Sequence, residues 1–140
     1  MTVVTKSTSP SMDANQARQV AAGNLYAGED LGAVAPCYIK ASDGKVYMSD
    51  GASSNEAAKF HGFTARETLA GEPVTLFGAG TRFKFSSGMT PGATLYIAAS
   101  DVYTDAGNLD TAATTGDSKG TAFAVSATDI VVCRTDPKNG

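Results

Sequence analysis

Short apolar runs separated by turn residues dominate the chain from residue 31 onward. Several of the runs alternate apolar with polar positions, and Gly, Asp, Asn and Pro stand between them. This pattern predicts eight or nine short strands joined by tight turns, with almost no helix. We therefore expect an all-β fold, a small antiparallel barrel or sandwich. The runs span residues 37–41, 45–48, 59–65, 73–77, 81–85, 94–98, 121–125 and 129–133.

The first two runs flank Asp43-Gly44, a dipeptide that is a strong signal for a hairpin. A two-residue loop is favoured here, because a four-residue loop would place Lys40 directly opposite Lys45, a pair of like charges. Both loops leave Tyr38 and Tyr47 on one face of the hairpin. The pairs expected for the two-residue loop are Ala41 with Val46 and Ile39 with Met48.

Three later runs give expectations about which side chains are buried. Phe60 and Phe63 cannot face the same side of a regular strand, so a bulge at Gly62 is expected to bring them together. The run 81–85 alternates, which directs its two Phe rings inward and its Arg and Lys outward. The unbroken apolar run 130–133 predicts a strand covered on both faces.

The N-terminal part has a different composition. Residues 1–28 are rich in Ser, Thr, Ala, Asn and Gln and contain few large apolar groups, so they cannot build a core alone. Ser11 is a suitable N-cap for a short helix over residues 12–22. We expect residues 1–28 to form an N-terminal arm that becomes ordered on another protein, residues 29–136 to form the β-domain, and residues 137–140 to form a tail.

Charge and cysteine content narrow the function classes. Eleven basic against 14 acidic residues give a net charge of −3, so there is no cationic stripe for direct binding to nucleic acid. No apolar run approaches the roughly 18 residues needed to span a membrane, and no secretory signal is evident, which predicts a protein made and kept in the cytoplasm, or exported by a route without such a signal. Cys37 and Cys133 both lie in apolar runs, where a free Cys behaves as a small buried group; a disulfide between them is the alternative.

No set of residues predicts catalysis, and neither an enzymatic activity nor a cofactor is expected. His61 is the single histidine, and Phe60 and Phe63 lie close to it in the sequence rather than a nucleophile. Gly78-Ala79-Gly80 lacks the third glycine of a dinucleotide fingerprint. One acidic set could supply oxygen ligands, but its spacing fits no calcium loop, so no metal site is predicted. Its members are Asp101, Asp105, Asn108 and Asp110.

The stretch from Pro36 to Phe85 resembles head decoration proteins of tailed bacteriophages, also called capsid cement proteins, and in particular those of the lambda type. The matching segments follow one another in the same order and at similar spacing over about a third of the chain: residues 45–51, 57–65, 74–77 and 80–85. The later segments, 88–97 and 120–132, look like a broader group of small β-domains of phage heads and virion surfaces. This later part is longer than in the lambda type.

The resemblance implies a β-tulip-like domain that sits as a homotrimer on the outer surface of the virion and binds the major capsid protein. It implies an N-terminal arm that reaches onto the coat. The composition fits this role, because Val3 and Val4 have high β propensity and could add a strand to a coat-protein sheet. The contact residues expected in the arm are Thr2, Val3, Val4, Thr5 and Lys6.

A second hypothesis is a virion-surface module of the tail, baseplate or head fibre that recognises a glycan or a host. Its candidate surface is an aromatic face made by Tyr38, Tyr47 and Tyr96, or the polar loop of residues 105–119.

Overall fold

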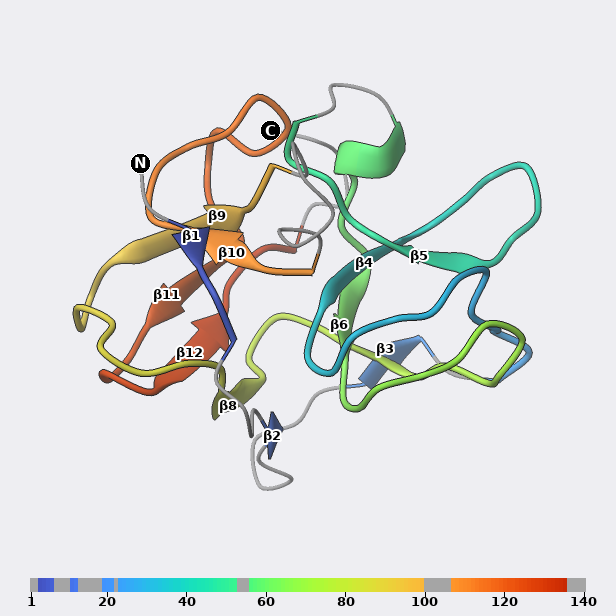
Figure 1. The fold of residues 1–140 in the computed structure, drawn as a ribbon, viewed down its shortest axis with the longest axis horizontal. Coiled ribbons are helices and arrows are strands. Elements are labelled where there is room, and N and C mark those ends of the chain that lie inside the picture. Colours follow the sequence, from blue (N-terminus) through green and yellow to red (C-terminus); the bar gives the residue numbers. More distant parts are fainter. Residues whose placement is uncertain are drawn as a thin grey trace.

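The structure, a computed structural model, describes residues 3–6, 11–12, 19–21, 23–52, 56–99 and 107–135. In these residues the chain is all-β: strands pair antiparallel in two sheets, with one short 3₁₀ turn, η2 (Glu56–Ala58). The large sheet has the order β1-β10-β9-β11-β12-β8-β2 and the small sheet the order β3-β7-β6-β4-β5 (Figure 1). The strands are β1 (Val3–Val4), β2 (Ser11–Met12), β3 (Gln19–Ala21), β4 (Pro36–Ile39), β5 (Val46–Met48), β6 (Gly62–Thr64), β7 (Leu76–Phe77), β8 (Arg82–Lys84), β9 (Thr94–Ile97), β10 (Leu109–Asp110), β11 (Ala122–Ala124) and β12 (Asp129–Val132).

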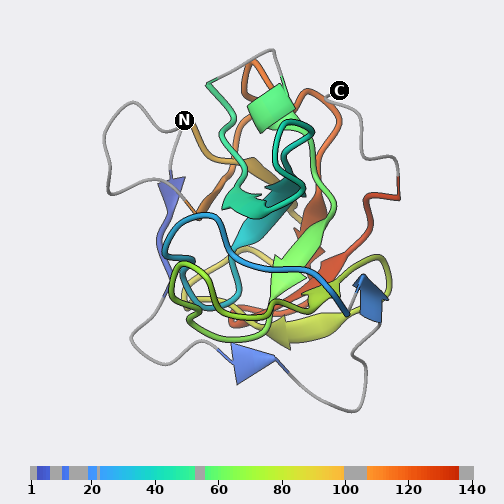
Figure 2. The same cartoon turned by 90° about the vertical axis from the view of Figure 1, so that its right-hand side faces the viewer.

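The two edges of the large sheet are consecutive strands in the sequence, and this requires the sheet to curl. β1 and β2 are six strand positions apart, about 29 Å in a flat sheet with strands about 4.8 Å apart. Only seven Cα steps separate Val4 from Ser11, and they span at most about 25 Å. The sheet therefore curls into a half-barrel, and the three N-terminal strands, in blue, lie around the periphery of the molecule (Figure 2).

A row of four phenylalanines joins the two sheets. The ring of Phe63 on β6 meets that of Phe83 on β8 edge to face, with centroids 5.1 Å apart. Phe60 extends the row on one side, 5.3 Å from Phe63, and Phe85 on the other, 6.5 Å from Phe83. All four belong to the main hydrophobic cluster, against which Val4 of β1 also packs. The main core thus lies between the sheets rather than within either one.

Phe60 and Phe63 share this core, as expected, but the expected bulge at Gly62 is wrong, since β6 pairs with β4 and β7 in regular register. Gly62 has a φ of +154°, and a Cβ there would lie 2.8 Å from the Cβ of Leu76. Both features favour glycine. Phe60 precedes β6, so the alternation of a regular strand does not apply to the pair.

A second, smaller apolar cluster belongs to the small sheet. It includes Cys37, Val46 and Leu76, with Leu25 and Ile39 packed against it. Residues 26–31 are attached to this sheet by isolated bridges, among them those of Tyr26 with Pro73 and of Leu31 with Thr68.

The hairpin of β4 and β5 has a four-residue loop, so the expected register is wrong. The pairs are Ile39 with Val46, Tyr38 with Tyr47 and Cys37 with Met48. Gly44, at a φ of +69°, donates its N–H to Lys40 O (2.8 Å), which closes the loop. Lys40 lies opposite Lys45, but its ammonium group stands over the Tyr47 ring, 5.0 Å from the centroid, which offsets the repulsion. The faces of the hairpin are as expected.

All eight expected runs contain a strand, and Phe83 and Phe85 are buried while Arg82 and Lys84 are partly exposed, as expected. The burial of residues 130–133 was predicted wrongly: Ile130 and Val132 are buried, but Val131 is only half-buried and Cys133 is exposed. β12 therefore has one covered face, because no element of the described chain packs on the other.

The described parts of residues 1–28 are built into the chain's own fold. β1 and β2 form the two edges of the large sheet, β3 pairs with β7, and Ala27 is buried. The expectation of an arm ordered only by another protein is wrong for these residues, since backbone pairing can hold a segment that has few large apolar side chains. A helix over residues 12–22 is excluded at β2 and β3; residues 13–18, Thr2 and the tail 137–140 lie outside the described residues.

Candidate functional site

β1 lies at one edge of the large sheet, with one side paired and the other open. Val3 lies opposite Asp110 and Val4 opposite Leu109 on β10. In the part of the chain that the structure describes, no strand pairs with the other side of β1. Such an edge presents backbone N–H and C=O groups that can accept a further strand.

Three hydrogen bonds hold the residues that follow β1. Ser86 Oγ donates to Thr5 O (2.6 Å). Lys6 N donates to Asn108 Oδ1 (3.3 Å), and Lys6 Nζ donates to Ala33 O (2.7 Å). Lys6 therefore connects the large sheet to the segment that leads into β4. We call residues 3–6 the edge segment.

The Lys6 ammonium group is held in an unfavourable environment. Burial lowers its pKa below the ordinary value of a lysine, and the nearby Cys37 thiol acts in the opposite direction. Neither of the two ion pairs among the described residues involves Lys6. The carbonyl oxygen of Ala33 is thus the acceptor that compensates its desolvation, and a neutral acceptor does so less well than a carboxylate.

A cavity of about 250 Å³ lies beside β1, and we call it the edge groove. Its apolar wall includes Val4, Met89 and Leu95, and hydroxyl groups such as those of Ser87 and Thr90 stand at its rim. None of the residues that line it carries a charge. Small-molecule sites usually measure about 300–1,000 Å³, so the edge groove fits one or two apolar side chains better than a cofactor.

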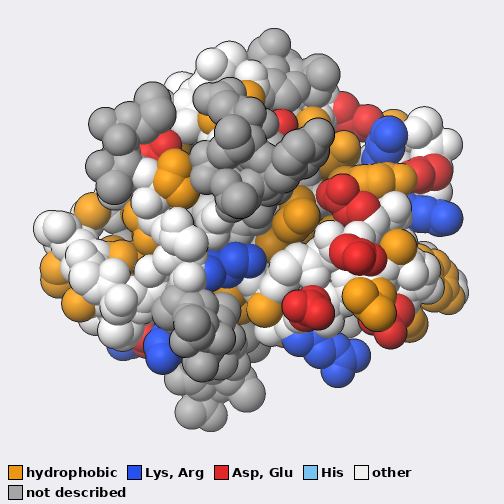
Figure 3. All heavy atoms as spheres, in the orientation of Figure 1, with side chains coloured by type: hydrophobic (Ala, Val, Ile, Leu, Met, Phe, Trp, Pro, Cys, Tyr) orange, Lys and Arg blue, Asp and Glu red, His pale blue; other side chains and the backbone are white. Residues whose placement is uncertain are grey.

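Charged side chains are unevenly distributed over the face of the molecule drawn in Figure 3. In Figure 3, Asp, Glu, Lys and Arg side chains gather over the small sheet at the right, and far fewer lie over the large sheet at the left.

The three predicted tyrosines do not form one aromatic face. Tyr38 and Tyr47 meet on the small sheet with ring centroids 6.0 Å apart, but Tyr38 is only 8% exposed. Tyr47 OH donates to Asp43 Oδ2 (2.6 Å), and this hydrogen bond raises the pKa of Tyr47 to about 12. Tyr96 lies on β9 in the other sheet. The Tyr38–Tyr47 pair therefore belongs to the β4–β5 hairpin, where Tyr47 is tied to Asp43 in the loop, and Tyr96 lies apart from it.

His61 has a structural contact. Its Nδ1 accepts the backbone N–H of Ile39 (3.0 Å), just before β6 begins. Burial, and next the charge of Lys59, lower the pKa of His61. A neutral ring is needed for Nδ1 to accept this bond, so the two observations agree.

The two cysteines are free and differ in exposure. Cys37 is buried and donates to Ala35 O (3.3 Å), and its burial raises the pKa of the thiol well above the ordinary value. Cys133 is exposed, contrary to the expectation of two buried thiols. The alternative of a disulfide between them does not occur in the structure.

The acidic set is only partly described, since Asp101 and Asp105 lie outside the described residues. The other two members are buried and support the sheet edge: Asn108 binds the edge segment, and Asp110 Oδ1 accepts the N–H of Ala112 (3.1 Å). Within the described ranges, no group of three or more His, Cys, Asp or Glu residues is placed to hold a metal ion.

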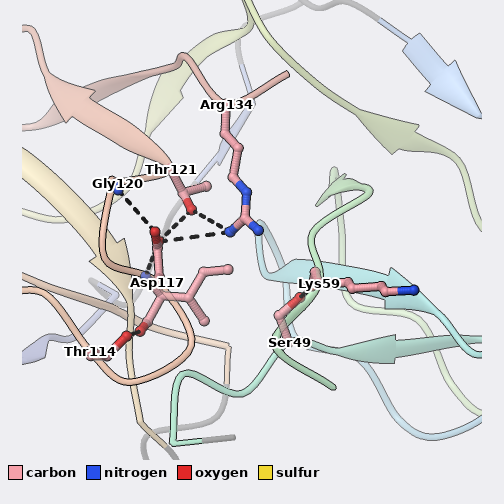
Figure 4. A network of polar contacts seen from close by, with 8 residues as sticks. Ser49, Lys59, Thr114, Asp117, Gly120, Thr121 and Arg134 are labelled. Carbon is pink, nitrogen blue, oxygen red and sulfur yellow. Dashed lines mark hydrogen bonds and ion pairs between the residues drawn. The ribbon is translucent and has the colours of Figure 1, made fainter. Parts of the chain in front are cut away.

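Asp117 is the centre of a buried polar network that the sequence did not reveal (Figure 4). Its side chain is 1% exposed and accepts hydrogen bonds from Ile97 N (2.9 Å), Gly120 N (2.9 Å) and Thr121 Oγ1 (2.7 Å). Arg134 Nη1 lies 3.9 Å from Asp117 Oδ2. One carboxylate therefore joins β9, the turn before β11 and the segment after β12.

The network also connects the two sheets. The guanidinium group of Arg134 stands over the ring of Phe60, 5.7 Å from its centroid. Gly116 N donates to Gly51 O (2.8 Å), and Gly51 N donates to Ala98 O (3.0 Å). The loop around Asp117 has no apolar periodicity, so the sequence predicts turns there but gives no signal that Asp117 is buried.

Comparison with known proteins gives no relationship: no known protein family matches the sequence, and neither does any curated protein. In the described part of the chain, no helix has the length and apolar character needed to cross a membrane.

Proposed function

We propose that the chain is a structural protein of a bacteriophage virion, a decoration protein that binds the outer surface of the expanded head. The sequence resemblance between residues 36 and 85 supports this proposal, and so does the all-β fold. The observation that carries it is the open side of β1 beside an uncharged, apolar groove. This combination suits docking of an extended segment of the coat protein.

Binding would proceed by addition of a coat-protein strand to β1. Backbone hydrogen bonds along Val3–Val4 would give affinity, and every second side chain of the added strand would point toward the edge groove. In this mechanism β1 acts from its place in the sheet and not as a free arm. Binding then costs less conformational entropy, because β1 is already held by β10, and Thr5 and Lys6 after it are held by hydrogen bonds with Ser86 and Asn108.

The stabilisation of the head follows from mass action. A ligand that binds neighbouring coat subunits only in their expanded arrangement favours that arrangement by its difference in affinity. If the chain acts as a homotrimer, the second and third contacts become effectively intramolecular, which raises avidity by roughly 10² to 10⁴. Weak contacts at each edge would then be sufficient.

The test is co-sedimentation of the purified chain with expanded and unexpanded heads that lack it, taken from the phage that encodes it. Ser87→Glu places a charge at the exposed rim of the edge groove and should abolish binding to expanded heads. Ser42→Glu makes the same change at the exposed tip of the β4–β5 hairpin and should leave binding unchanged.

Equal binding of both variants would refute the role of the edge groove. Failure of the parent chain to sediment with either kind of head would refute the decoration function. A saccharide signal on a glycan array, together with no binding to heads, would favour host recognition.

A further inference from the structure

We propose that the edge segment exchanges between copies of this chain, so that β1 of one copy occupies the place beside β10 in a second copy. The inference concerns the purified chain alone and does not rest on the proposed function.

The edge segment can leave without disturbing the order of the other strands. β1 is the terminal strand of the large sheet, and only two register pairs, Val3 with Asp110 and Val4 with Leu109, connect it to β10. Val4 is a partly buried residue at the margin of the main cluster, whose buried members all come from residues 34–132. The buried members of the main cluster therefore all stay in place when the segment moves, and only the contact of Val4 at its margin is lost.

Burial of the Lys6 charge weakens the attachment of the edge segment to the rest of the chain. The ammonium group is desolvated beside Ala33 O, and no described carboxylate forms an ion pair with it. Release returns this charge to water, which recovers part of the cost of breaking the three hydrogen bonds. The segment is consequently held less firmly than its contacts alone would suggest.

The position that the segment leaves must be filled again. Asn108, Leu109 and Asp110 are at most 5% exposed, and without β1 they would form a new sheet edge with unpaired backbone groups. The strand that fits this place in sequence and in contacts is residues 3–6 of another copy. It would restore the bonds from Ser86 and to Asn108 and Ala33, because exchange of an identical element preserves every contact.

The connection to β2 limits how the copies are arranged. If β2 remains on its own β8, the seven Cα steps from Val4 to Ser11 allow β1 to reach at most about 25 Å. The β10 edge of the second copy must then lie within this distance of β2 in the first copy. Reciprocal exchange closes a dimer, and cyclic exchange closes a ring.

The experiment uses two full-length pools in a Cys133→Ser background, one with Val3→Cys and the other with Asp110→Cys. These positions are Cα partners across β1 and β10, a spacing that a disulfide can bridge. The pools carry tags of different mass, are mixed, and are oxidised in a glutathione buffer. Exchange should yield at least about tenfold more mixed disulfide than a control mixture of Val3→Cys with Ser42→Cys, because paired strands raise the effective concentration.

The control is the Val3→Cys/Asp110→Cys double variant, in which an intrachain disulfide should form readily. If it does, equal yields of mixed disulfide in the two mixtures would overturn the proposal. Because Asp110 is buried, a second measurement avoids any change to it. Isotope-labelled and unlabelled parent chains are mixed and examined by native mass spectrometry. Mixed oligomers that disappear on deletion of residues 1–6 support exchange, and a monomer at every concentration contradicts it.

Discussion

Replacing Asp117 by Ala should destabilise the chain more than any change at its surface ion pair. The substitution removes the acceptor of three short hydrogen bonds, those from Ile97 N, Gly120 N and Thr121 Oγ1. It also removes the carboxylate that lies 3.9 Å from Arg134 Nη1, and the Arg134 side chain is only 6% exposed. Removal of one partner of a buried ion pair costs about 3–5 kcal/mol, a large part of the roughly 5–15 kcal/mol that stabilises a typical domain.

Urea unfolding followed by far-UV circular dichroism is the suitable assay, since the chain has no Trp. Asp117→Ala should lower the free energy of unfolding by about 3–5 kcal/mol with an unchanged m-value. In a thermal scan the same loss corresponds to a melting temperature lower by roughly 10–20 °C.

Asp129→Ala is the matched control. It removes the carboxylate of the more exposed ion pair with Arg82, and we expect it to cost about 1 kcal/mol or less. A further variant, Asp117→Ala/Arg134→Met, also removes the guanidinium charge beside this position and should recover part of the loss. The account of the network is refuted if Asp117→Ala and Asp129→Ala have equal effects.

Three further predictions concern single residues. Gly62→Ala should lower the melting temperature more than Gly71→Ala. Both glycines have a positive φ, but only a Cβ at residue 62 would lie close to other atoms. Equal melting temperatures of the two variants would contradict this. In the native chain one thiol per molecule, that of Cys133, should react with a thiol reagent, and Cys37 should react only after denaturation; two native thiols would disagree with its burial. Burial lowers the pKa of His61 in the folded chain, so the unfolded chain binds more protons below about pH 6.5. The free energy of unfolding should therefore fall as the pH drops from 7 to 5. The His61→Gln variant should show a smaller fall, and the same dependence on pH in both chains would exclude His61 as the cause.

The strands of the β-domain were predictable because their signals are local. Alternation in the run 81–85 and the turn residues between runs depend on neighbours in the sequence, and the structure has strands there. The hairpin register was not predictable from like charges alone, since the Lys40 ammonium group finds the Tyr47 ring across the strand. Such a contact is known only when the loop conformation is known.

The edge groove and the Asp117 network could not be predicted from the sequence, because both are formed by residues that are far apart in it. The β-branched side chains of Val3 and Val4 favour a strand. No neighbouring residue, however, indicates that this strand pairs with β10, about a hundred residues away. Asp117 sits in a polar loop whose composition is typical of solvent exposure. Its burial results from segments around residues 97, 121 and 134 that meet only in the folded chain.

The sequence by itself determined the fold class, eight of the nine strands from β4 onward and the inward direction of most of their side chains; it missed β10, which lies in the expected polar loop of residues 105–119. These follow from the period of two and from turn chemistry, which act over a few residues. The tertiary structure decided the place of the N-terminal strands, the exposure of Cys133 and the burial of Asp117. Each of these depends on which distant strands become neighbours, and closure of the half-barrel by a short connection sets that order.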